Sequence, residues 1–188
     1  MNVNRRGILM AAMLAGAGMH GLSRAQAAPA VPAEVAAALP AARLQGSGRL
    51  RFLGMAIYDA RLWAGAAAVP PVGDWNALPF AIELVYARTL WGSMIAERSL
   101  TEMGRQGDIA PEVAERWLAA MKALFPDVKE GDRVTGVHTP GQGGRFFLNG
   151  KAHGATMDEA FARVFFGIWL SPKTSEPALR SALLGQVP

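Results

Sequence analysis

The order of strand-like and helix-like patterns along the chain constrains the fold more than any single motif does. Two strand patterns, from Arg49 to Trp63 and from Phe80 to Ala87, precede two helical patterns that follow each other directly. Three short strand patterns and two further helices come after them. Helices do not alternate with strands one by one, so this order predicts an α+β fold with an antiparallel sheet.

Local signals place the later elements. Residues 132–139 and 145–148 flank a Pro-Gly-Gln-Gly-Gly connection, and Asn149-Gly150 supplies a two-residue turn with positive φ angles, so three short antiparallel strands are expected. Residues 156–159 read as a capping box that starts a helix. The apolar side of that helix is rich in aromatic residues, and we expect it to lie deep against the sheet.

The stretch GSGRLRFLGMAIYDARLW, residues 46 to 63, is predicted to be one long strand, bent or broken near Gly54. In a regular strand, five residues of equal parity would share one face: Arg49, Arg51, Leu53, Met55 and Ile57. If that face is covered, the arginines need an anionic partner. A carboxylate ligand would serve, and so would Glu83, Glu97 or Glu102. The alternative is that Arg49 precedes the buried part and Arg51 extends along its stem to water.

The N-terminal residues have the pattern of a cleavable export signal. A basic start, a short apolar run and Ala25-Gln26-Ala27 predict removal of residues 1–27, by the Sec route or, given Arg5-Arg6, by twin-arginine export. We therefore expect a periplasmic protein without a stable membrane anchor, because the apolar run is shorter than the roughly 20 residues that span a bilayer. Residues 28–43 form an Ala- and Pro-rich lead-in, expected to be loosely held, and residues 44–188 form a single domain.

Composition excludes several classes of function. Loss of the signal would lower the 19 Lys and Arg residues to 16, against 15 acidic residues, so no basic face for nucleic acid is expected. Absence of cysteine rules out thiol catalysis. His138 and His153 have no helical partner for a metal, and we expect both to be solvated. No phosphate loop or Gly-x-Ser-x-Gly elbow is present, and no cofactor is expected.

Five stretches, taken in order, resemble the bacterial chalcone isomerase-like family. They are GSGRLRFLGMAIYDARLW, PFAIELVYAR, IAERSLTEM, LFPDVKEGDRVTGVHTPGQGGRFFLNGKAHG and FARVFFGIWLSPKTSEPALRSALLG, and together they cover nearly all of residues 44–185. The resemblance implies the chalcone isomerase fold. This is an open-faced β-sandwich in which a long antiparallel sheet is covered by a layer of helices, with a cleft between sheet and helices.

The resemblance also implies that the polar network of the plant enzyme is largely lost. That enzyme uses an arginine with Thr, Tyr and ordered water to polarise the ketone of a chalcone. Here Leu53 falls where the enzyme has Thr, Ile95 falls near its Tyr, and Glu102 falls near its Asn. Arg49 is the nearest candidate for its arginine.

Related plant proteins with this fold bind fatty acids without catalysis, so the leading hypothesis is a non-catalytic binder of a fatty acid or similar apolar carboxylate. The predicted ligand contacts are Arg49, Arg51, Leu53, Met55, Ile57, Ile95 and Arg98, with Arg49 or Arg51 holding the carboxylate. One alternative is an isomerase or intramolecular lyase acting on an unsaturated carbonyl compound. A third possibility is a haem-binding module, for which the two histidines are poorly placed.

Overall fold

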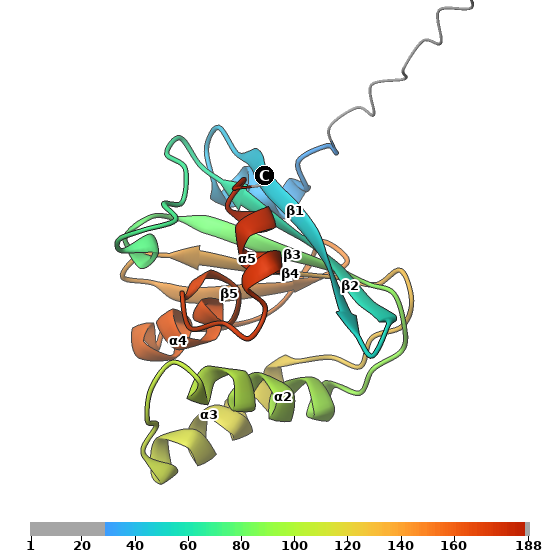
Figure 1. Cartoon of the computed structure of the whole chain (residues 1–188), viewed down its shortest axis with the longest axis vertical. Coiled ribbons are helices and arrows are strands. Elements are labelled where there is room, and N and C mark those ends of the chain that lie inside the picture. Colours follow the sequence, from blue (N-terminus) through green and yellow to red (C-terminus); the bar gives the residue numbers. More distant parts are fainter. Residues whose placement is uncertain (1–28, 187–188) are drawn as a thin grey trace, which may run out of the picture.

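A computed structural model describes residues 29–186, and within them one antiparallel sheet dominates (Figure 1). Its six strands are hydrogen-bonded in sequence order: β1 (Arg43–Phe52), β2 (Met55–Ala64), β3 (Phe80–Tyr86), β4 (Arg133–Thr139), β5 (Gly143–Leu148) and β6 (Lys151–Thr156). Each strand pairs only with its neighbours along the chain. The predicted α+β class with a long antiparallel sheet is therefore confirmed.

Helices lie over both faces of the sheet, but most of them over one, here called the front face. That layer consists of α2 (Gly92–Gly104), α3 (Pro111–Leu124), α4 (Glu159–Leu170) and α5 (Pro177–Leu183). A short 3-10 helix, η1 (Trp75–Ala77), precedes β3, and α1 (Ala33–Ala38) lies against the back face. The open-faced arrangement expected from the family resemblance is confirmed.

The core forms where α4 meets the middle of the front face. Phe166 is fully buried, and its ring lies against Gly136 of β4 and Gly144 of β5, where a Cβ atom would stand only 3.0 and 3.3 Å from ring carbons. The absence of side chains at these two positions leaves a hollow for the ring. Phe165 packs beside it, edge-on against the ring of Phe146. The aromatic helix is thus core, as the sequence pattern indicated.

The lead-in before β1 is held more firmly than expected. Val35 of α1 is fully buried against Trp63 and Ala81 on the back face of the sheet. The carboxylate of Glu34 accepts a 2.9 Å hydrogen bond from Thr135 and pairs with Arg133 at 3.0 Å. The expectation of a loosely held segment is therefore wrong for residues 33–39. The two buried apolar residues, Val35 and Leu39, lie in a short Ala-rich stretch, and such a short pattern does not predict that the segment packs on the sheet.

The stretch from residue 46 to residue 63 is a hairpin, and not the single strand that was predicted. Leu53 and Gly54 form its two-residue turn with φ angles of 49° and 80°, and Phe52 pairs with Met55. Arg49 and Arg51 therefore lie on β1, and Met55 and Ile57 lie on β2. The expectation that all five residues line one face of one strand is wrong. Leucine at a positive φ angle is rare, so composition did not signal the turn.

The other local predictions hold with small shifts. Asn149 and Gly150 adopt positive φ angles between β5 and β6, as predicted. Helix α4 begins later than the capping-box pattern indicated, because Asp158, and not Thr156, accepts the hydrogen bond from the backbone N–H of Phe161. The predicted export signal lies outside the described residues. Within residues 29–186, no helix is long and apolar enough to cross a bilayer.

Gly46 allows α5 to pack on β1, and this contact provides the first test. A Cβ atom at this position would clash with the backbone carbonyls of Ala182 and Leu183. Overpacking of this kind costs about 1–3 kcal/mol, so Gly46→Ala should lower the Tm by roughly 3–10 °C in a thermal melt. Gly104→Ala is the matched control, since its Cβ would meet open space at the end of α2. Equal Tm values for the two variants would contradict the packing described.

Candidate ligand-binding cavity

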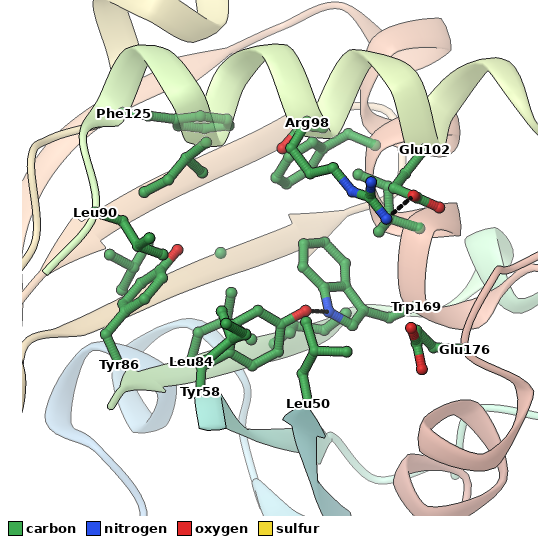
Figure 2. Close-up of a pocket in the computed structure, with 18 of the residues that line it drawn as sticks. Leu50, Tyr58, Leu84, Tyr86, Leu90, Arg98, Glu102, Phe125, Trp169 and Glu176 are labelled. Carbon is green, nitrogen blue, oxygen red and sulfur yellow. Dashed lines mark hydrogen bonds and ion pairs between the residues drawn. The ribbon is translucent and has the colours of Figure 1, made fainter. Parts of the chain in front are cut away.

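A cavity of about 380 Å³ lies between the front face of the sheet and the helix layer (Figure 2). Its floor is made by side chains of the strands and its walls by side chains of the helices and their connections, most of them apolar. The main contributors are Leu50, Tyr58, Ile82, Leu84, Tyr86, Val134 and Phe146 from the sheet, and Ile95, Phe165, Trp169 and Leu179 from the helices. A cavity of this size and character suits a small apolar molecule.

The cavity exists because α2 packs on α3 and α4 and not closely on the strands. The first turn of α2 is held by the segment that follows α3. The N–H of Gly92 donates a 2.7 Å hydrogen bond to Asp127, and Leu90 forms an isolated bridge with Val128. Gly92 has no room for a side chain, because a Cβ would clash with the carbonyl of Phe125. The helix is thus positioned by its neighbours and leaves space beneath it.

Polar groups gather at one end of the cavity. The Tyr58 hydroxyl accepts a 3.1 Å hydrogen bond from Nε1–H of Trp169, which leaves its own O–H free to donate toward a ligand. Nearby, Glu102 is only 8% exposed and pairs with Arg98 at 2.6 Å and with Arg105 at 3.0 Å. Figure 2 shows Tyr58, Trp169, Arg98 and Glu102 at this end, and Tyr86 with Leu90 and Phe125 at the other.

Both tyrosines are neutral hydrogen-bond donors over the physiological range. Burial raises the pKa of Tyr58 and of Tyr86 above the ordinary 10.0, because removal from water disfavours the phenolate. Glu176 and Glu102 raise the pKa of Tyr58 further, while the hydrogen bond from Trp169 and the charge of Arg98 oppose the shift. The polar end therefore offers a phenol and a guanidinium as donors.

The predicted site residues divide into two groups. Arg51, Ile57, Ile95 and Arg98 border the cavity, while Arg49, Leu53 and Met55 are not among its lining residues. Leu53 stands at the hairpin tip and is 83% exposed. Met55 lies beside Arg88, whose Nη1 is 3.3 Å from its sulfur.

Of the two arginines first considered as carboxylate anchors, Arg49 is engaged away from the cavity and Arg51 stands at its border. Arg49 makes a two-pronged pair with Asp59, at 2.6 and 2.7 Å, and this pairing lowers the pKa of the Asp59 carboxyl. Arg51 is exposed and donates to the carbonyl of Gly54 at 3.2 Å, and its charge also helps to lower the pKa of Asp59. Arg98 is the arginine whose charge acts on Tyr58 inside the cavity.

Sequence analysis missed the tyrosines and Trp169 as site residues. One signal was available for Tyr86, which continues the alternation of Phe80, Ile82 and Leu84 on the front face. The hydrogen bond between Tyr58 and Trp169 joins residues 111 positions apart and has no local signal.

The two histidines outside the predicted export signal have different surroundings. His138 is fully buried, which corrects the expectation that it is solvated. Its ring nitrogens face the carbonyl oxygens of Gly143 and Asn76, and its ring packs against Phe80 and Phe166. His153 is exposed. Within residues 29–186, no group of three or more His, Cys, Asp or Glu side chains could hold a metal ion.

The architecture defines the class of protein: an antiparallel sheet with most of its helices over one face and a mainly apolar cavity between the two layers. The model of the chalcone isomerase-like family matches residues 30–185, and the chain belongs to that family. It is also 29% identical, over 115 residues, to an uncharacterized protein of Haemophilus influenzae. That alignment covers 59% of this chain and 54% of the relative, so the chain spans about half of that protein's length.

A solved structure shares the fold at low sequence similarity. The crystal structure of a fatty-acid binding protein from Arabidopsis thaliana superposes with a TM-score of 0.61 and 15% identity. The match covers 78% of this chain and 88% of that protein. At this identity the likeness shows a common fold.

Ionisation of the tyrosines tests the burial of the cavity floor. Tyr58 and Tyr86 are the only tyrosines in the chain, so absorbance near 295 nm reports on them alone. Their pKa values are raised in the folded state, so above pH 10 the unfolded chain loses these protons more readily than the folded chain does. The free energy of unfolding is therefore unaffected by the two tyrosines below pH 10 and falls as the pH rises above it. We expect no tyrosinate in the native protein near pH 10.5, and its abrupt appearance on unfolding. Gradual titration near pH 10 in the folded state would contradict the buried geometry.

Proposed function

We propose that this protein binds a fatty acid or a similar apolar carboxylate in the cavity without transforming it. The observation that carries the proposal is the division of the cavity into a part lined mainly by apolar side chains, with the hydroxyl of Tyr86 at its far end, and an end where Tyr58 and Arg98 offer donors side by side. Support also comes from the fold, which is shared with a plant fatty-acid binding protein. An acyl chain gains free energy by leaving water, at roughly 0.8 kcal/mol per CH₂ group.

In the proposed complex the acyl chain lies along Leu84, Leu90 and Phe125, and the head group lies at the polar end (Figure 2). The Tyr58 O–H donates to one carboxylate oxygen, and Arg98 turns part of its fork toward the other. Glu102 stays compensated during this change, because Arg105 also pairs with it.

Net charge is not what would hold the head group. Arg98 and Arg105 are balanced by Glu102 and Glu176, the two carboxylates that also act on Tyr58. The binding energy of the head group therefore comes from directed donors, and a ligand that lacks an acceptor there should bind less well.

Two matched pairs of variants test the position of the head group. Tyr58→Phe and Arg98→Gln should each weaken binding of a fatty acid by about tenfold, since a hydrogen bond to a charged group contributes about 1.5–3 kcal/mol. Tyr86→Phe, at the other end of the cavity, and Arg49→Gln, which is paired with Asp59, should leave affinity unchanged. Isothermal titration with a fatty acid and with its methyl ester measures these effects.

The same proteins decide whether any acyl ligand binds. Native mass spectrometry and lipid extraction of the purified wild type should reveal a bound apolar acid, or one should be taken up on titration. If neither occurs, the proposed function is wrong. If Tyr58→Phe and Arg98→Gln both bind as the wild type does, the head group does not lie at the polar end of the cavity.

An isomerase remains the competing proposal. Three mismatches with the polar network of the enzyme count against it, at Leu53, Ile95 and Glu102. Leu53 stands at an exposed turn and says nothing about polarity inside the cavity, whereas Ile95 and Glu102 line it. Tyr58 and Arg98 could polarise a carbonyl group there. Loss of the absorbance of naringenin chalcone, abolished in Arg98→Gln, would favour the isomerase, and a stable absorbance would favour the binder.

We further propose that the protein is exported after removal of residues 1–27. The proposal rests on the basic, apolar and small-residue pattern of the N-terminal sequence. Intact mass measurement after expression should give a chain that begins near Ala28 in the periplasmic fraction. A full-length chain confined to the cytoplasm would refute it.

A further inference from the structure

Exposed apolar side chains are concentrated beside the mouth of the cavity. Seven large apolar side chains are exposed among the described residues, and five of them lie at the tip of the β1–β2 hairpin or at the start of α2. These five, here called the rim, are Phe52, Leu53, Met55, Trp91 and Met94. The other two, Val72 and Met157, lie elsewhere. Such a concentration marks an interaction surface and is not the usual scatter of exposed apolar residues.

The two segments of the rim are adjacent in space. The N–H of Ala87 donates a 2.9 Å hydrogen bond to the carbonyl of Ile57, which ties the start of β2 to the segment that leads into α2. Phe52 and Met94, one from each segment, both line the cavity. The rim is thus continuous with the interior in which an acyl chain would lie.

Leu53 occupies its place in the rim at a cost. Its φ angle of 49° is one that asparagine or glycine adopts readily and leucine rarely does. At 83% exposure the side chain gains little packing within the described chain to offset this strain. A contact outside the molecule would account for an apolar residue at the tip of this turn.

The charges around the rim identify the kind of surface it fits. Arg51 at the hairpin and Arg88 beside Met55 are basic, and neither pairs with an acidic side chain within residues 29–186. On the adjoining loop, Lys129 offsets the charge of Glu130, while the carboxylates of Asp127 and Asp132 accept hydrogen bonds from the backbone N–H groups of Gly92 and Lys129. The nearest acid on the hairpin, Asp59, is already paired with Arg49. Apolar tips flanked by unpaired arginines match a bilayer whose head groups are anionic.

We propose that the rim docks on the surface of an anionic lipid bilayer, with the cavity mouth toward the head groups. Leu53, Phe52 and Trp91 enter the boundary between head groups and acyl chains, while Arg51 and Arg88 meet lipid phosphates. The hairpin ends in a two-residue turn, and its tip lies beside the connection that leads from β3 into α2 (Figure 1). Docking itself needs no ligand, so it can be tested apart from the proposed function.

Leu53→Asn is the central variant, because asparagine suits the turn and removes the apolar tip. Binding is measured by co-sedimentation with two kinds of vesicle, one of phosphatidylcholine alone and one that also contains about 30% phosphatidylglycerol. The salt concentration is about 0.15 M, so that charges are screened as they are at physiological ionic strength. The wild type should bind the anionic vesicles, and Leu53→Asn should bind about tenfold more weakly, as expected for the loss of one partly inserted leucine. Its Tm should not fall.

Val72→Asn is the matched control. Val72 is 85% exposed and lies in the connection between β2 and β3, at the opposite end of these strands from Leu53. This variant should bind vesicles as the wild type does. Arg51→Gln combined with Arg88→Gln should reduce binding to the anionic vesicles and abolish the difference between the two lipid compositions. All variants carry the same N-terminus, so any contribution of that segment cancels.

Three outcomes would overturn the proposal. The wild type fails to bind anionic vesicles, or Leu53→Asn and Val72→Asn bind them equally well. The third is a dimer in sedimentation velocity that the Leu53→Asn substitution dissociates. Titration of a fatty acid in solution, without vesicles, separates this proposal from the proposed function. Leu53→Asn should retain wild-type affinity there, because Leu53 does not line the cavity. Failure of acyl binding together with intact vesicle binding would refute the function and leave the docking surface standing.

Discussion

The contact between α4 and the middle of the sheet determines the rest of the structure. Phe166 fits the hollow above Gly136 and Gly144, and this contact fixes the distance at which the helix layer begins. Helix α5 can approach β1 because Gly46 and Gly48 carry no side chains. Helix α2 has no such contact with the strands and leans on α3 and α4. Helix α3 also reaches the sheet, where the side chain of Leu124 lies against Gly154 of β6. The cavity is the space left beneath α2, and it needs no special element to hold it open.

Arginines on the two faces of the sheet have different neighbours, and this separates the charges that stabilise the fold from those that belong to the proposed binding site. On the back face, Arg49 pairs with Asp59, Arg61 with the buried Glu83, and Arg133 with the buried Glu34. Glu83 and Glu34 would be costly to bury alone, so Arg61 and Arg133 are needed where they are, whereas Arg49 and Asp59 form an exposed pair. On the cavity side, Glu102 has two arginine partners, and one of them can turn away without leaving a buried charge uncompensated. Spare pairing of this kind allows a polar group to be recognised without loss of the fold.

Much of the fold was predictable because its signals are local. The Asn149-Gly150 turn, the aromatic helix and the order of elements each depend on residues close in sequence. The hairpin at Leu53 was missed because leucine carries no turn signal. As a result, the predicted site residues from Arg49 to Ile57 were placed on one strand, whereas they lie on two paired strands and the turn between them. The polar end of the cavity could not be predicted from local patterns, since Tyr58, Arg98 and Trp169 come from three distant elements. Only the fold brings them together.

The missed turn and the proposed docking surface have one physical origin. A hairpin stabilised only from within would place asparagine or glycine where Leu53 stands, since both tolerate a positive φ angle. Leucine costs stability there and gains little burial within the described chain. The same residue would be favourable if the apolar medium were supplied from outside, because inserting its side chain would then offset the strain. Leu53 is poorly suited to the backbone conformation of its turn and lies beside the mouth of the cavity. Its presence is therefore better explained by the surface proposed to contact that mouth than by the stability of the fold.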